Sequence, residues 1–141
     1  MKRDLGDGLE LDDDPARIDV DAVHAFISRE SYWAQGRQRA DVERLVREAD
    51  RVVGLYSDGT QVGFCRAVTD GAHVVYLADV YVLAEHRGRG LGLELVREMV
   101  ENGPFAGRTW LLHTRDRHRL YAKLGFGAPG DRLMERPAPG R

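Results

Sequence analysis

Apolar residues recur every three or four positions in three stretches of the chain: Val20–Ser28, Arg39–Ala49 and Leu91–Asn102. This spacing places the apolar side chains on one face of an α-helix and predicts three amphipathic helices. Asp19 is well placed to cap the first helix, and Gly103-Pro104 ends the third. A shorter helix is expected at about Arg115–Lys123.

Strand patterns lie between and after these helices. Three apolar runs, Arg51–Tyr56, Gln61–Val68 and His73–Leu83, are separated by Asp58-Gly59 and Asp70-Gly71. Asp-Gly between apolar runs is typical of tight hairpins, in which both central residues have positive φ. The runs therefore predict an antiparallel meander whose last and most apolar strand is central. Thr109–His113 follows the third helix and predicts a further strand, parallel to the last strand of the meander.

Weaker patterns flank this core. Gly8–Asp12 predicts a short edge strand, and Phe126 with Arg132–Glu135 predicts a closing hairpin. The arm before the edge strand and the tail 136–141 are expected to be mobile. A length of 141 residues suits one domain, with its core at about 8–135. The whole pattern predicts an α+β fold, with a mixed, mostly antiparallel twisted sheet and helices on both of its faces.

Composition and charge narrow the classes of function. The chain is 43% hydrophobic and 31% charged, as in ordinary globular proteins, and its net charge of −2 supplies no basic field for nucleic acid. No stretch approaches the roughly 18 apolar residues of a membrane span. The single cysteine fits a reducing cytoplasm, and the five histidines show no metal-ligand spacing. We therefore expect a cytoplasmic protein that binds neither nucleic acid, nor membrane, nor metal.

The glycine-spaced turn Arg87–Gly92 follows the most apolar strand and precedes a helix. Strand, glycine turn and helix N-terminus together present several free N–H groups to an anion, and a pyrophosphate fits such a site. The turn is no P-loop, because no Gly-Lys-Ser/Thr follows. It is no dinucleotide fingerprint either, because the preceding strand belongs to an antiparallel meander. A purely structural tight turn is the alternative.

Two motifs resemble those of the GCN5-related N-acetyltransferase (GNAT) superfamily. Arg87-Gly88-Arg89-Gly90-Leu91-Gly92 matches its signature Arg/Gln-x-x-Gly-x-Gly/Ala, and Tyr121–Phe126 matches its tyrosine ahead of Gly-Phe. The order of elements agrees over about residues 8–135. The resemblance implies an acetyltransferase that uses acetyl-CoA as co-substrate. It also implies a splayed central strand pair, Asp79–Leu83 and Thr109–His113, with the cofactor between them.

The resemblance also implies roles for particular residues. Tyr121 would act as general acid toward the departing thiolate, and the amide near Val80 would stabilise charge on the reacting oxygen. Many members have Asn at the position of Thr114, and that Asn side chain bonds the pantetheine. The Thr114 hydroxyl could replace the Asn side chain, or it could cap the following helix. The implied cofactor contacts are Val80, Tyr81, Val82, Arg87, Gly88, Arg89, Gly90, Leu91, Gly92, Leu93 and Thr114.

Asp79 is the candidate general base. It interrupts the apolar run Val74–Leu83, where a carboxylate is costly unless it has a partner or a task. It could deprotonate or bind the substrate ammonium, or it could form an ion pair with Arg66. His113 and His118 are weaker candidates for a proton relay.

Tyr32 and Trp33 lie in the loop between the first two helices, which in this superfamily helps to shape the acceptor pocket. They could form an aromatic wall for a small amine, or they could pack between the helices. The expected function is therefore acetylation of a primary amine of a small metabolite. Alternatives are acetylation of a protein N-terminus or lysine, and a catalytically silent CoA-binding regulatory module. A homodimer is possible.

Overall fold

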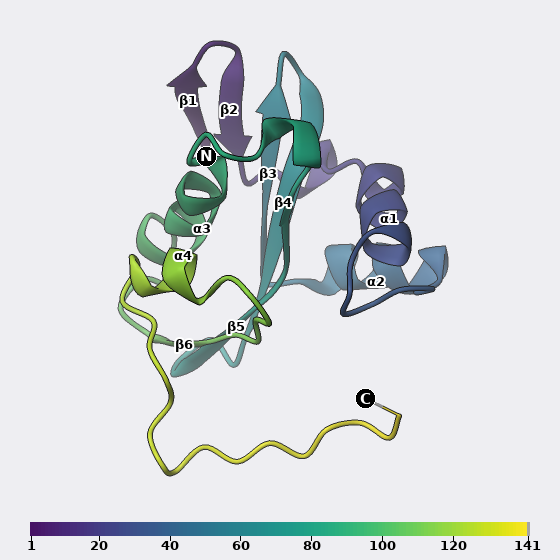
Figure 1. Ribbon diagram of the computed structural model, residues 1–141. Helices are drawn as coiled ribbons and strands as arrows, with labels where there is room; N and C mark the ends of the chain where they lie inside the picture. The colour runs from purple at the N-terminus through teal and green to yellow at the C-terminus, as the bar shows by residue number, and fades with distance from the viewer. Residues whose placement is uncertain (141) are drawn as a thin grey trace.

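Six strands form one sheet in the order β1-β2-β3-β4-β5-β6 in the computed structural model, which describes residues 1–140 (Figure 1). The strands are β1 Lys2–Gly6, β2 Leu9–Asp12, β3 Arg51–Ser57, β4 Thr60–Thr69, β5 Val74–Val82 and β6 Thr109–Leu111. The helices are α1 Val20–Arg29, α2 Arg39–Glu48, α3 Leu91–Glu101 and α4 His118–Ala122, with 3₁₀ turns η1 Pro15–Arg17 and η2 Ala84–His86. All neighbouring strands are antiparallel except β5 and β6.

The helices cover opposite faces of the sheet, with α1 and α2 on one side and α3 and α4 on the other (Figure 1). Each side has its own apolar core. Buried residues on the α1 side include Phe26, Ile27, Val42, Val46, Val52, Phe64 and Tyr81. Those on the α3 side include Leu55, Cys65, Val75, Leu77, Leu95, Val96, Met99 and Tyr121. The predicted α+β fold with helices on both faces is confirmed.

The two Asp-Gly turns differ. Asp58 and Gly59 both have positive φ, 48° and 84°, and join β3 to β4 as a two-residue hairpin, as predicted. The loop between β4 and β5 is longer, and in it only Gly71 has positive φ. There Asp70 Oδ1 accepts hydrogen bonds from the N–H groups of residues 72, 73 and 74. These bonds fix a wider loop and lower the pKa of Asp70 to about 2.

The N-terminal arm is a paired strand, so the prediction that it is mobile was wrong. β1 pairs with β2 and becomes the sheet edge in place of the predicted strand at Gly8–Asp12. β1 has no apolar alternation, because as an edge strand it is almost wholly exposed. The pairing itself holds it in place.

The closing hairpin predicted from Phe126 and Arg132–Glu135 is also wrong. Residues 127–140 form no strand and run as an extended tail beneath the body (Figure 1). The last helix is shorter than predicted, because residues 115–117 form a turn before α4. β6 is therefore the other edge of the sheet.

β5 and β6 separate after three paired positions. Val74, Val75 and Tyr76 pair with residues 109–111, and β5 then continues to Val82 without β6. The predicted splayed strand pair is confirmed. Within the described chain, the edge of β5 from Leu77 to Val82 that faces away from β4 has no strand partner.

A β-bulge lies in this unpaired part of β5. Phe64 pairs with Tyr81 and Arg66 pairs with Ala78, so Asp79 and Val80 together oppose one residue of β4. Asp79 has φ 54°, a left-handed conformation that Asp tolerates better than most residues. The extra residue reverses the alternation of side chains. Val75 and Leu77 face the α3 core before the bulge, whereas Tyr81 faces the α1 core after it.

Candidate active site

The glycine turn connects β5 to α3: the Arg87 N–H donates to Ala84 O, whereas the N–H groups of residues 88–93 donate to no backbone carbonyl within residues 1–140. Gly88 and Gly90 have φ 78° and 74°, and no atom lies within 4 Å of the position that a Cβ would take at either glycine. Gly90 is the N-cap and supplies no side chain to the helix. The N–H of Glu94 donates to Gly90 O at 3.2 Å, so the earlier N–H groups of α3 lie beyond the intrahelical ladder. This geometry is suited to an anion.

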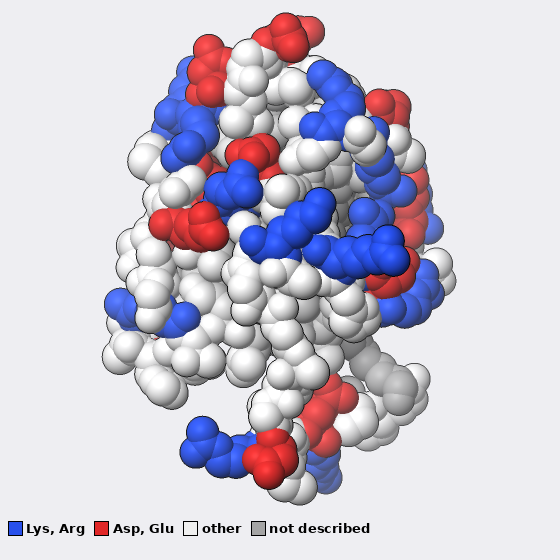
Figure 2. All heavy atoms as spheres, turned by 60° about the vertical axis from the view of Figure 1, so that its left-hand side comes forward, with Lys and Arg blue, Asp and Glu red and all other residues white. Residues whose placement is uncertain are grey.

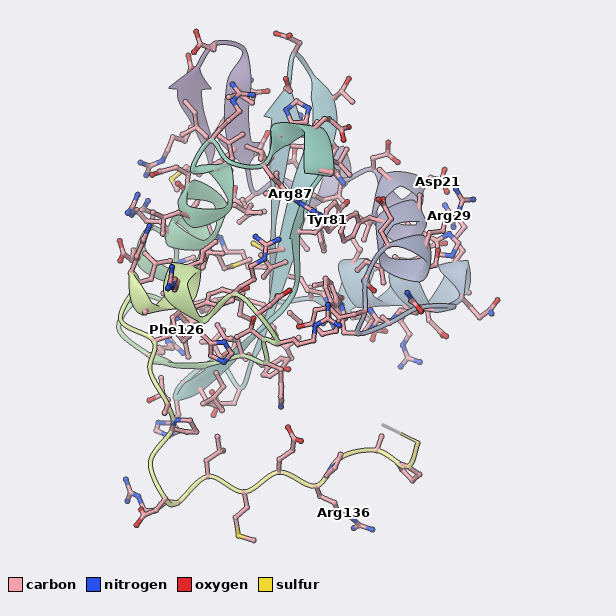
Figure 3. The ribbon with its side chains drawn as sticks, viewed as in Figure 1. Asp21, Arg29, Tyr81, Arg87, Phe126 and Arg136 are labelled. Carbon is pink, nitrogen blue, oxygen red and sulfur yellow. The ribbon has the colours of Figure 1, made fainter. Side chains whose placement is uncertain are left out.

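Arg87 holds this turn against the end of β5. Its Nε donates to Val82 O at 2.9 Å, and its side chain lies beside the end of the strand near Tyr81 (Figure 3). Arg89 is exposed. Arg87, which the family resemblance implies as a cofactor contact, therefore also has a structural contact within the chain.

Tyr121 is buried on the α3 side, where its ring contacts Phe126 edge-on with centroids 5.8 Å apart. Burial raises the pKa of Tyr121 to about 12. Its hydroxyl is therefore protonated at neutral pH, as a proton donor must be.

Asp79 lies in a cluster of cationic and aromatic side chains on the α1 side. Arg66 Nε donates to its Oδ2 at 2.6 Å, and Arg37 Nη1 donates to both carboxylate oxygens at 3.1 and 3.2 Å. Trp33 Nε1 donates to Oδ1 at 2.8 Å. Burial raises the pKa of Asp79, but the charges of Arg66 and Arg37 and these hydrogen bonds outweigh it and leave the pKa below its ordinary value. The ion pair with Arg66 that the sequence left open is present.

Loops from the two sides of the sheet meet at Tyr32. Its ring packs edge-on against Trp33, with centroids 5.1 Å apart, and its hydroxyl accepts a hydrogen bond from the N–H of Arg115 at 2.8 Å. The guanidinium of Arg115 stacks 3.9 Å from the centre of the same ring. The loop between α1 and α2 thus contacts the turn between β6 and α4, which leads to Tyr121.

Thr114 Oγ1 accepts a hydrogen bond from the N–H of Arg117 at 3.0 Å and stabilises the turn into α4. Because α4 begins only after Arg117 and has no side-chain cap, Thr114 does not cap the helix as one of its two interpretations proposed. His113 bonds the hydroxyl of Tyr76 through one ring nitrogen and Glu135 through the other, while His118 is exposed. Neither histidine contacts Tyr121 or Asp79 through a hydrogen bond in residues 1–140.

Tyr121 also lines a hollow of about 1180 Å³ between β6, α4 and the tail. Figure 2 shows this side of the molecule, with charges of both signs over its upper part, mostly uncharged residues below them and charges of both signs again at the bottom. Arg136 extends from the tail, well away from Phe126 (Figure 3). Within residues 1–140, no group of three or more metal-ligating side chains gathers, and no helix could span a membrane.

The sequence missed Arg37 and Arg115. Nothing in their neighbourhood marks them, because both act through partners more than 40 positions away: Asp79 for Arg37 and Tyr32 for Arg115. One signal existed for the cluster as a whole. An Asp inside an apolar run requires compensation, and two arginines provide it here.

Comparisons with known proteins agree with this geometry. The profile of the Acetyltransferase (GNAT) family matches residues 18–126. A Gibberella zeae protein named "Putative acetyltransferase" is 34% identical, over 80% of this chain and 76% of its own length. A GNAT-family protein of Xanthomonas campestris pv. campestris, known from its crystal structure, is 36% identical with a TM-score of 0.86, covering 94% of each chain.

A more distant structure, from Deinococcus radiodurans R1, shares the fold at 22% identity and a TM-score of 0.72, covering 95% of this chain and 92% of its own. The chain belongs to the GNAT family of acetyltransferases. Members of this family generally use acetyl-CoA and act on small-molecule or protein amines.

Proposed function

We propose that this protein transfers the acetyl group of acetyl-CoA to a primary amine of a small molecule, by direct attack of the amine. The observation that carries the proposal is that two stretches of backbone with free hydrogen-bonding groups follow one another along the chain. The unpaired edge of β5 ends at Val82, and the uncapped N-terminus of α3 begins at Leu91. An extended amide chain and a pyrophosphate are the two groups that such surfaces bind.

The residues fit this co-substrate. The backbone of Val80–Val82 would bind the pantetheine amides as an added strand does, and the N–H groups of Gly88–Leu93 would bind the pyrophosphate. The open space at Gly88 and Gly90, where a side chain would otherwise stand, supports close approach of a ligand. When bound, acetyl-CoA supplies an activated acetyl thioester.

Two groups of the chain would assist the transfer. The Val80 amide, at the bulge, would stabilise negative charge on the acetyl oxygen. Tyr121 would give its hydroxyl proton to the thiolate sulfur, and its raised pKa keeps that proton in place until then.

Asp79 fits a positioning role better than the role of a base. A carboxylate with a lowered pKa, already engaged by Arg66, Arg37 and Trp33, has little tendency to accept a proton. The amine would then lose its proton to water before it attacks.

Tyr32 and Trp33 support a small acceptor. Their loop is tied to Arg115 on one side and to Asp79 on the other, which favours an enclosed pocket over the open groove that a peptide needs. Tyr32 remains 42% exposed, so its ring is available to an acceptor.

Acetyl-CoA binding, measured by titration calorimetry, tests the first half of the proposal. Gly90→Val should abolish binding, because the side chain would occupy the pyrophosphate position. Gly71→Val is the matched control: it has a similar positive φ and equally open space, but it lies in the β4–β5 loop. Equal affinity in both variants would refute the pyrophosphate site.

Transfer to a panel of small amines and peptides tests the second half. Tyr121→Phe should lower kcat about 100-fold with little change in acetyl-CoA affinity, if the hydroxyl is the proton donor. An unchanged kcat would remove Tyr121 from the mechanism. Activity on peptides alone would favour the protein-acceptor alternative, and tight binding without any transfer would favour the silent module.

A further inference from the structure

The cluster around Asp79 contains more positive than negative charge. One carboxylate faces two guanidinium groups, from Arg37 and Arg66, which leaves a formal charge of +1. The side chains are 4% exposed for Asp79, 19% for Arg37 and 12% for Arg66. A net charge this poorly hydrated attracts an anion more strongly than the same charge on the open surface.

Both arginines keep unused hydrogen-bond donors. Arg66 bonds Asp79 through Nε only, and Arg37 bonds it through Nη1 only. Within residues 1–140, the one fully buried guanidinium nitrogen without a partner is Arg108 Nη1. The spare nitrogens of Arg37 and Arg66 therefore reach solvent, where a carboxylate or phosphate could accept from them in the geometry that guanidinium favours.

The cluster stands directly before the proposed site of transfer. Asp79 is followed by Val80–Val82, and Trp33 links it to Tyr32. The bulge brings this about, because it places the Asp79 side chain among residues of the α1 side at the open part of β5. An anion bound here would lie beside an amine that reaches the β5 edge.

We propose that the acceptor amine also carries an anionic group, a carboxylate or a phosphate, that is bound by the spare nitrogens of Arg37 and Arg66. This inference rests on the proposed function, since it names the acceptor class of the same site. Asp79 holds the two guanidinium groups in place and offsets one of their charges. Arg37 and Arg66 would then determine specificity.

Matched amine pairs test the proposal by steady-state kinetics. An amino acid is compared with its amide, and phosphoethanolamine is compared with ethanolamine, so that carboxylate and phosphate are separated. The wild type should prefer the anionic member of at least one pair by about tenfold or more in kcat/KM. Equal kcat/KM within both pairs, with transfer still measurable, would overturn the proposal and leave the proposed function intact.

Arg37→Gln should remove most of this preference through KM, because Arg66 still pairs with Asp79 and preserves the fold. Arg37→Lys should restore part of it. Arg44→Gln is the control, since Arg44 lies exposed on α2 and pairs only with Glu48. A loss in Arg37→Gln that is equal for anionic and neutral amines would also contradict the proposal.

A binding measurement decides the case even if no amine is acetylated. Trp110→Phe leaves Trp33 as the single tryptophan, and its indole contacts Asp79 directly. Addition of the amino acid or phosphoethanolamine should change its fluorescence saturably, whereas the neutral partners should not. Arg37→Gln in this background should weaken the effect about tenfold. No response to either anion would overturn the proposal, whereas failure to bind acetyl-CoA would count against the proposed function instead.

Discussion

The charge clusters around Arg51 and around Asp79 differ in how fully their guanidinium groups are hydrogen-bonded. In the first, Arg51 bonds Asp13 through Nε and Nη2 and the carbonyls of Glu98 and Met99 through Nη1. Arg3 bonds the Glu98 carboxylate at 2.6 Å, and the N-terminal ammonium of Met1 bonds Asp13, so each carboxylate has two cationic partners. In the second, Asp79 alone faces Arg37 and Arg66.

The difference separates a structural cluster from a candidate binding site. Each of the three nitrogens of Arg51 has an acceptor, including two carbonyls in the last turn of α3, where a cation is favourable. Arg51 therefore attaches the end of that helix to the sheet. The cluster at Asp79 keeps spare hydrogen-bond donors beside the unpaired edge of β5, which suits recognition of a ligand.

The largest expected effect comes from removal of one anion in each cluster. Asp79→Asn should lower the free energy of unfolding by about 3 kcal/mol or more, because it leaves two partly buried guanidinium groups without a counter-charge. Glu98→Gln should cost about 1–2 kcal/mol, because Arg51 keeps Asp13 and both carbonyls. Denaturant unfolding of the two variants measures this. A larger loss in Glu98→Gln would reverse the comparison.

A smaller effect is expected from crowding of Arg51. A Cβ at Gly103 would stand 2.2 Å from Arg51 Nη1, so Gly103→Ala must displace the guanidinium from the end of α3. The expected cost is about 1–2 kcal/mol in unfolding free energy, with kcat/KM of the folded enzyme unchanged. Gly127→Ala, where no atom lies within 4 Å of the added Cβ, is the neutral control. Altered acceptor preference in Gly103→Ala would mean that the two clusters are coupled.

The smallest effect concerns acid stability. The folded pKa of Asp79 lies below its ordinary value of 3.8, so its contribution to stability is present above about pH 4 and is lost as the pH falls through the folded value. Thermal unfolding between pH 7 and pH 3 should therefore show a shallower fall in Tm for Asp79→Asn than for the wild type. Identical slopes would mean that Asp79 has no favourable charge partner.

The features that the sequence predicted correctly are local ones. Asp58-Gly59 forms a hairpin because its own backbone preferences suffice, and the glycine turn needs only the strand before it and the helix after it. The signature around that turn, with Tyr121 ahead of Gly125 and Phe126, identified the family from short stretches of chain.

The features that it missed depend on distant partners. β1 is a strand only because β2 lies beside it, and the expected closing hairpin does not form although its residues have a strand-like pattern. The charge cluster joins Trp33 and Arg37 to Asp79 across more than 40 positions, so the sequence marks it only through Asp79, a carboxylate in an apolar run. Propensity and periodicity describe each segment alone and cannot report which segments meet.

The bulge determines on which face of the sheet each later side chain of β5 lies. If the same residues alternated strictly, with no bulge, every side chain from Asp79 to Val82 would lie on the opposite face of the sheet. Tyr81, now stacked 4.0 Å from Phe26, would turn toward the core of α3, and Val82 would turn toward α1. Deletion of one residue at the bulge would instead keep Tyr81 and Val82 on their present faces, because the extra residue and the reversal would be lost together.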